Sequence, residues 1–122
     1  MKNEENLKEF KIVVLGESGV GKTSIIQRYT NDKFEDNPIS TKCASFDTKI
    51  IKIDEFNETY VKLNIWDTAG QEKYRSLAKI FYKDASAAIL VYDTTNKKSF
   101  EEIKEYWYNQ VKECSQKNTN KY

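Results

Sequence analysis

Two short runs of apolar residues, many of them β-branched, stand out from an otherwise polar chain. Residues 10–15 read Phe-Lys-Ile-Val-Val-Leu and stop at Gly16, and residues 87–92 read Ala-Ala-Ile-Leu-Val-Tyr. A short and nearly continuous apolar run is typical of a strand that is buried on both faces of a sheet. The pattern therefore predicts a buried strand at residues 10–15 and a second, fully apolar strand at residues 87–92.

Helical periodicity appears in three further segments. Within residues 23–30, the apolar positions follow helical spacing at Ile25, Ile26 and Tyr29. A longer helix is predicted to begin at Ser99, whose hydroxyl can cap the first turn while Glu102 reaches back to it. Its apolar stripe recurs at steps of three or four residues, at Phe100, Ile103, Trp107, Val111 and Cys114. A short helical stretch is expected around residues 74–82.

Alternation of apolar and polar residues marks the segments 46–53 and 60–67, which a polar turn separates. Such alternation is typical of half-buried strands, so the two segments predict an antiparallel hairpin. One face of the second segment is formed by Val61, Leu63 and Ile65. Asp67 continues this face at the end of the strand.

Strands that alternate with helices predict a doubly wound α/β fold, with a mostly parallel sheet that includes one antiparallel hairpin strand. The chain has 122 residues, which is enough for one domain with its own core. We assign residues 10–114 to this domain, residues 1–9 to a flexible charged tail and residues 115–122 to a polar C-terminal tail.

Composition argues against several functional classes. With 20 basic and 19 acidic residues, the formal net charge is +1, so no overall field would attract nucleic acid. The chain has no histidine, and Cys43 and Cys114 are isolated, which argues against zinc sites and Ser-His-Asp catalysis. The apolar runs are too short to span a membrane and the N-terminus is too polar for a signal peptide. We therefore expect a cytoplasmic protein.

The strongest chemical motif is the segment 16–23, Gly-Glu-Ser-Gly-Val-Gly-Lys-Thr, which matches G-x-x-x-x-G-K-[ST] between a predicted strand and a predicted helix. Glycines let successive backbone N–H groups turn toward phosphate oxygens at the start of the helix. Lys22 would add a cation and Thr23 a hydroxyl that can ligate Mg²⁺. The expected nucleotide-binding residues of this segment are Glu17, Ser18, Gly19, Val20, Gly21, Lys22, Thr23 and Ser24. The structural alternative is a glycine turn that only caps a helix.

A second candidate group follows the hairpin, at Asp67-Thr-Ala-Gly70-Gln71. In open α/β sheets, ligands bind beyond the carboxyl ends of the strands, so Asp67 could hold Mg²⁺ through water. Gly70 leaves its backbone free to approach a γ-phosphate, and Gln71 could orient an attacking water. Alone, this segment would be interpreted as a strand-end turn, but the phosphate-loop motif favours a binding role.

Taken together, these segments resemble the Ras-like small GTPases, and within them the Rab branch. The resemblance extends from about residue 10 to residue 111. It rests on three segments in the expected order: Lys-Leu-Asn-Ile-Trp-Asp-Thr-Ala-Gly-Gln-Glu at 62–72, Lys-Tyr-Arg-Ser-Leu at 73–77 and Leu-Val-Tyr-Asp-Thr-Thr at 90–95. The resemblance implies the P-loop NTPase fold of these proteins.

The resemblance also implies individual roles. Thr41 falls where the family coordinates Mg²⁺ and senses the γ-phosphate, and Phe34 falls where an aromatic ring packs against guanine. The implied metal ligands are therefore Thr23, Thr41 and Asp67. Three aromatic residues, Phe46, Trp66 and Tyr82, match the triad that Rabs present to effectors, although ordinary core packing explains them equally well.

Function follows from the same resemblance. A Rab-like protein binds GTP and GDP with Mg²⁺ and hydrolyses GTP as a switch in membrane trafficking, with Gln71 and Lys22 as the catalytic residues. The implied partners are an exchange factor, a GTPase-activating protein and effectors, which bind an expected monomer. Endomembrane association is typical of the family, and residues 76–78 and 87–91 look most like early-endosomal Rabs.

Three features depart from the family pattern. Thr41-Lys42-Cys43 stands where Rabs usually have Thr-Ile-Gly. The guanine-reading Asn-Lys-x-Asp motif is missing, because Asn120-Lys121-Tyr122 lacks the aspartate, and no prenylatable C-terminal cysteine is present. The expectation is a C-terminally truncated domain with an uncovered strand edge at residues 89–91. Two alternatives stay open: a partner-binding module with little GTPase activity, and a nucleotide-binding module without base preference.

Overall fold

The computed structural model describes residues 7–32, 34, 45–68 and 80–116. Within these residues the sheet has four strands, in the order β2-β3-β1-β4. The strands are β1 (Lys8–Leu15), β2 (Ser45–Asp54), β3 (Thr59–Asp67) and β4 (Ala87–Leu90). β1 runs parallel to both β3 and β4, whereas β2 and β3 form an antiparallel hairpin. The predicted mostly parallel sheet with one antiparallel strand is therefore confirmed.

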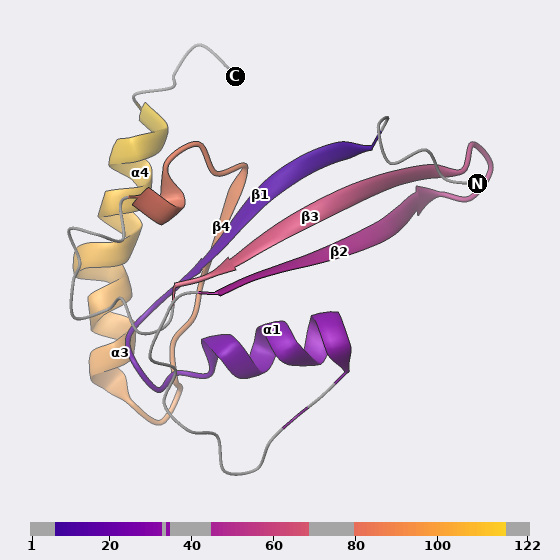
Figure 1. Cartoon of the computed structure of the whole chain (residues 1–122). Helices are drawn as coiled ribbons and strands as arrows, with labels where there is room; N and C mark the ends of the chain where they lie inside the picture. The colour runs from indigo at the N-terminus through magenta and orange to yellow at the C-terminus, as the bar shows by residue number, and fades with distance from the viewer. Residues whose placement is uncertain (1–6, 33, 35–44, 69–79, 117–122) are drawn as a thin grey trace.

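Helices lie on both sides of this sheet (Figure 1). Helix α1 (Lys22–Asn31) covers one face. The other face is covered by a continuous helical segment made of α3 (Lys97–Glu102), the π-helical turn η2 (Ile103–Trp107) and α4 (Tyr108–Gln116). The helical residues 80–82 form the described end of the helical stretch that was expected around residues 74–82. This three-layer arrangement is the doubly wound fold.

β1 supplies both halves of the core because its successive side chains point to opposite faces. Val13 and Leu15 belong to the cluster on the α4 side, together with Tyr82, Ile103 and Trp107. Val14 belongs to the cluster on the α1 side, together with Ile26, Ile65 and Val91. The buried strand expected at residues 10–15 is thus the centre of the molecule.

Three boundaries differ from the sequence-based expectation. β4 ends at Leu90, although the apolar run continues to Tyr92. β1 begins at Lys8, so Lys8 and Glu9 belong to a strand rather than to the tail. They extend β1 because they pair in register with Val61 and Lys62 of β3. Ser115 and Gln116 likewise continue α4, although they were assigned to the polar tail.

The start of the last helical segment also differs. The N-cap of α3 is Asn96, whose side chain accepts a hydrogen bond from the backbone N–H of Ser99. The predicted capping box at Ser99 is therefore wrong. Ser99 is the third residue of α3 and is only 1% exposed. Its hydroxyl accepts a hydrogen bond from the Asp93 N–H at 2.9 Å and donates to the Asn96 carbonyl at 2.7 Å, so it joins the segment after β4 to the start of α3.

Replacing Ser99 with alanine is expected to lower the free energy of unfolding by about 2 kcal/mol, because it leaves the Asp93 N–H without its buried acceptor. Urea unfolding followed by circular dichroism measures the loss. The exposed neighbour Lys98 provides the control, since Lys98→Ala should change stability by less than about 0.5 kcal/mol. Equal losses in the two variants would contradict the bridging role of Ser99.

β4 lies at one edge of the sheet, and among the described residues it pairs with β1 alone. Ile89 on this strand is 48% exposed. Within the described ranges, β4 therefore has the uncovered apolar edge that was expected. None of the helices in these ranges is both long enough and apolar enough to cross a lipid bilayer.

Candidate functional site

The carboxyl ends of three parallel strands, β1, β3 and β4, lie side by side at one end of the sheet. The register pairs Val14 of β1 with Asp67 of β3, and Leu15 of β1 with Leu90 of β4. The strand order changes direction at β1, because β2 and β3 lie on one side of it and β4 on the other. Doubly wound proteins bind ligands at this kind of switch point. The loop between β1 and α1 leaves the sheet there.

Lys22 is the first residue of helix α1, and its side chain folds back into this loop. Its side chain is only 3% exposed, and its Nζ donates to the backbone carbonyls of Gly16 at 2.8 Å and Glu17 at 2.7 Å. The loop thus wraps around a buried ammonium group. No side chain caps the start of α1, whose N-cap residue is Gly21 with φ +103°. First-turn N–H groups next to a fixed cation form an arrangement that suits phosphate oxygens.

Thr23 and Asp67 meet across the same site. The Thr23 hydroxyl donates to Asp67 Oδ2 at 2.6 Å, and the Asp67 side chain is 1% exposed. The next residue, Thr68, is also buried and donates its hydroxyl to the Val14 carbonyl at 2.7 Å, which fixes the end of β3 against β1. The fold therefore brings together two oxygen donors that are far apart in the sequence.

This donor pair fits a magnesium ion. Mg²⁺ prefers hard oxygen ligands and usually binds proteins through one or two side chains, with water and substrate phosphates completing its shell. A hydroxyl and a carboxylate already within hydrogen-bonding distance satisfy that requirement. Of the three expected metal ligands, Thr23 and Asp67 lie together, whereas Thr41 lies outside the described residues.

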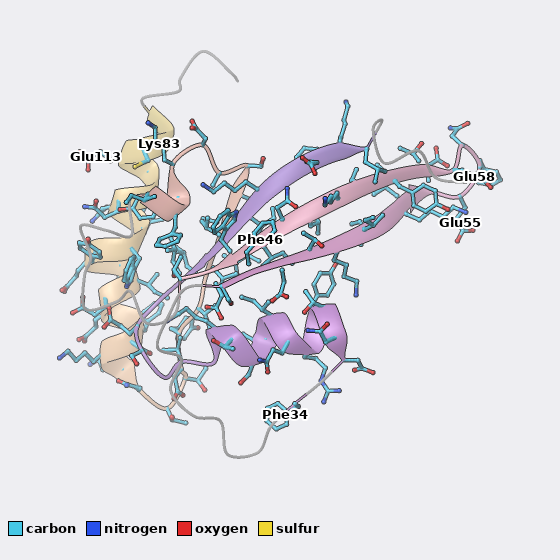
Figure 2. All side chains as sticks on the ribbon, viewed as in Figure 1. Phe34, Phe46, Glu55, Glu58, Lys83 and Glu113 are labelled. Atoms are coloured by element: carbon cyan, nitrogen blue, oxygen red, sulfur yellow. The ribbon has the colours of Figure 1, made fainter. Side chains whose placement is uncertain are left out.

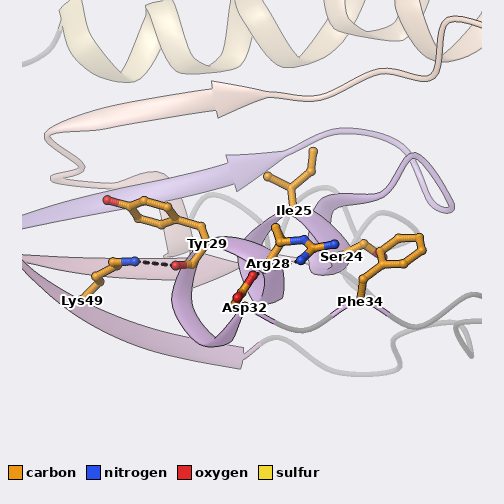
Figure 3. Close-up of a pocket in the computed structure, with 7 residues that line it drawn as sticks. All are labelled: Ser24, Ile25, Arg28, Tyr29, Asp32, Phe34 and Lys49. Atoms are coloured by element: carbon orange, nitrogen blue, oxygen red, sulfur yellow. Dashed lines mark hydrogen bonds and ion pairs between the residues drawn. The ribbon is translucent and has the colours of Figure 1, made fainter.

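Phe34 lies at a separate hollow beside α1 (Figure 3). The hollow has a volume of about 680 Å³, and Phe34 is 58% exposed at its wall. The other lining residues are Ser24, Ile25, Arg28, Tyr29, Asp32 and Lys49. Two expected nucleotide-binding residues, Ser24 and Phe34, therefore line the same hollow, whereas Lys22 and Asp67 do not.

The expected aromatic triad needs a correction. Phe46, which is labelled in Figure 2, and Trp66 lie opposite each other on β2 and β3, with ring centroids 4.8 Å apart. Tyr82 is instead only 4% exposed, and burial raises the pKa of its phenol far above the usual range. The ring beside Trp66 is Phe81, with centroids 6.1 Å apart. Tyr82 points into the core because consecutive residues of a helical turn face different directions.

The remaining expected residues divide into two groups. Ser18 and Gly19 are exposed at the loop, and Val20 packs on the α1-side core cluster. Thr41, Gly70 and Gln71 lie outside the described residues.

One contact of the loop was not predicted from the sequence. Trp107 donates its indole N–H to Glu17 Oε1 at 3.0 Å, across 90 residues of sequence. Nothing in the spacing of these residues signals that contact.

Comparison with known proteins agrees with this geometry. The Ras family model matches residues 11–122. The chain is 52% identical over 91 residues to "Ras-like GTP-binding protein RYL2" of Yarrowia lipolytica, covering 75% of this chain and 42% of that protein. It is 50% identical over 97 residues to mouse "Ras-related protein Rab-21", covering 80% and 42%, and 43% identical over 102 residues to "Ras-related protein Rab-1" of Theileria annulata, covering 84% and 45%.

The chain therefore spans somewhat less than half the length of these relatives, between 42 and 45%. The family match nevertheless covers nearly all of the chain, including the loop, β3 and the last helical segment. On this sequence match and on the doubly wound fold with its phosphate loop, the chain belongs to the Ras family and is Rab-like.

Proposed function

We propose that this chain forms the phosphate-binding and magnesium-binding part of a Rab-like small GTPase, which binds GTP and GDP and hydrolyses GTP as a switch in membrane trafficking. The observation that carries the proposal is the Thr23–Asp67 contact of 2.6 Å beside the buried Lys22 ammonium. A hydroxyl, a carboxylate and a cation at the start of a helix meet the requirements of a nucleotide phosphate with its metal ion.

In this proposal the loop residues 16–23 bind and orient the phosphates. Lys22 stabilises charge on the β- and γ-phosphates, and Gln71 orients the attacking water, so catalysis comes from positioning and electrostatics. Thr23, Thr41 and Asp67 hold Mg²⁺, which neutralises phosphate charge when it is bound. Gly70 approaches the γ-phosphate, and Phe34 with Ser24 lies on the side of the base.

Titration of the purified chain with fluorescent GTP, GDP and ATP analogues, with and without Mg²⁺, tests the function. We expect magnesium-dependent binding of the guanine nucleotides. Equal affinity for the ATP analogue would favour a nucleotide-binding module without base preference. A correctly folded chain that binds none of them would leave only the partner-binding module.

The Asp67→Asn variant tests the metal site. It keeps the shape of the side chain but removes the negative charge beside Thr23, so the gain in GDP affinity that Mg²⁺ provides should fall by about 10-fold to 100-fold, a range typical when a group supporting a metal site is lost. Isothermal titration with and without Mg²⁺ measures this gain. Asp84, between the helical residues 80–82 and β4, is exposed, so Asp84→Asn is a matched control. A magnesium gain that stays at the wild-type value in Asp67→Asn would remove Asp67 from the metal site.

Hydrolysis is tested separately with Gln71→Leu. If Gln71 orients the attacking water, this change slows single-turnover hydrolysis by about 10-fold or more, while the affinity for GTP analogues changes little, because only the transition state uses the contact. Phosphate release measured on the preloaded chain gives the rate. Unchanged hydrolysis would exclude the assigned role.

Partners and location complete the proposal. An exchange factor, a GTPase-activating protein and effectors would bind around the nucleotide site, and effectors would use the exposed faces of Phe46, Trp66 and Phe81. Support comes from the close packing of these three rings and from the 47% exposure of Phe46. We propose a monomer that associates with endomembranes, as the Rab relatives suggest.

A further inference from the structure

Glu17 connects the phosphate loop to the opposite side of the sheet. Its backbone carbonyl accepts a hydrogen bond from Lys22 Nζ at 2.7 Å. Its carboxylate accepts the indole N–H of Trp107 at 3.0 Å. One residue therefore contacts both the buried cation of the loop and a side chain of the last helical segment.

Trp107 is well suited to hold Glu17 in place. It is the largest fully buried side chain among the described residues and is 1% exposed. It packs in the same core cluster as Val13 and Leu15, the residues of β1 that lead into the loop. A buried indole N–H with a charged acceptor forms a stronger hydrogen bond than a neutral pair, and the surrounding core keeps the indole from moving.

The helix at this point has unusual geometry. Trp107 ends the π-helical turn η2, where the backbone N–H of Tyr108 bonds to the carbonyl of Ile103 instead of following the α-helical pattern. Such turns are rare within α-helices and are often found at functional sites. The wider turn is part of the local geometry that places Trp107 within reach of Glu17.

The charge of Glu17 gives this contact a consequence for ligand binding. A carboxylate in a loop that surrounds phosphates would repel them if it faced the ligand. The Trp107 contact directs this carboxylate toward the α4-side core cluster, whereas α1, which begins at the loop, packs on the other cluster. The Glu17 carbonyl meanwhile stays on Lys22.

We propose that Trp107 is a positioning residue of the phosphate loop, which acts through Glu17 to keep the Lys22 ammonium in place and a carboxylate away from the phosphates. This inference rests on the proposed nucleotide binding. It assigns to the last helical segment an influence on nucleotide affinity that acts through Glu17.

A double-mutant cycle tests the proposal. Trp107→Phe keeps an aromatic ring but removes the N–H donor, and it should weaken binding of a fluorescent GDP analogue by about 10-fold to 100-fold, the order expected for one hydrogen bond to a charged group. In the Glu17→Ala background the same substitution should change affinity less than twofold. Tyr108→Phe, on the exposed neighbour, serves as the control and should leave affinity unchanged. Equal losses from Trp107→Phe in both backgrounds would show a packing effect only and overturn the proposal.

A second measurement does not depend on nucleotide. In the nucleotide-free chain, hydrogen exchange of the amides of residues 17–21 should speed up in Trp107→Phe and in Glu17→Ala, and the double variant should exchange no faster than Glu17→Ala. If the wild-type chain binds no nucleotide but the variants show this exchange pattern, the proposed function fails while the positioning role stands. Loop exchange unchanged in both single variants would overturn the positioning role. Should Trp107→Phe fail to fold, Glu17→Ala alone must reproduce the faster loop exchange.

Discussion

Replacing Lys22 with methionine is expected to lower the affinity for GDP and GTP analogues by at least about a hundredfold. The ammonium group is buried in the loop and is held by the carbonyls of Gly16 and Glu17 at 2.8 and 2.7 Å. Methionine retains most of the apolar stem but removes the charge and leaves both carbonyls without their donor. A hydrogen bond to a charged group contributes about 1.5–3 kcal/mol, and a hundredfold loss of affinity corresponds to about 2.8 kcal/mol.

Titration of the variant with a fluorescent GDP analogue measures this loss. Lys98 is exposed on α3, so Lys98→Met is the matched control and should bind like the wild type. Circular dichroism should show that both variants retain their helix and strand content. If a folded Lys22→Met variant binds the GDP analogue with an affinity within a few-fold of the wild type, Lys22 does not contact the phosphates.

Replacing Gly16 with alanine is expected to destabilise the fold itself, by about 3–5 kcal/mol. An added Cβ would lie 2.3 Å from the Val91 carbonyl oxygen and 3.3 Å from the Val91 carbonyl carbon, both in the backbone just beyond β4. Gly16 also has φ +151°, a conformation that other residues rarely adopt. The steric contact and the unfavourable backbone conformation each cost about 1–3 kcal/mol. Relieving the contact would also disturb the hydrogen bond from the Val91 N–H to the Leu15 carbonyl.

Such a loss would be a large part of the stability of a small domain, so the melting temperature should fall by about 10 °C or more. Gly19→Ala is a sharp control, because Gly19 has φ +80° but nothing within 4 Å of its added Cβ. The control carries only the backbone cost of about 1–2 kcal/mol. Similar melting temperatures for the two variants would mean that the contact with the Val91 backbone is not what excludes a side chain at position 16.

The sequence predicts this fold well where one periodic pattern governs each element. The apolar run at residues 10–15 and the alternation in residues 46–53 and 60–67 correspond to β1 and the hairpin. The expected face of β3 is also present, because Val61, Ile65 and Asp67 are less than 10% exposed. Leu63, the fourth member of this face, is partly buried and packs against the α1-side cluster. The phosphate-loop motif correctly indicated a strand before it and a helix after it.

The errors arise where tertiary contacts select among similar local signals. Asn96 and Ser99 are both good capping residues, and the buried bridge from Ser99 to Asp93 leaves the cap to Asn96. Phe81 and Tyr82 are adjacent aromatic residues, and only the packing of the helical turn decides which one lies beside Trp66. The π-helical turn and the Glu17–Trp107 contact depend on the folded chain, so no local pattern announces them.

The central position of β1 also determines the order in which the sheet can assemble. β2 and β3 are neighbours in sequence and pair as a hairpin, so they can meet as soon as their turn forms. β1 has no such local partner in the part of the chain that the structure describes, because there it pairs with β3 and β4, which follow much later in the chain. Closing these distant contacts slows folding, and during synthesis β1 must wait for both partners to emerge. We therefore expect the phosphate loop, which extends from β1, to reach its final shape only in the last stage of folding.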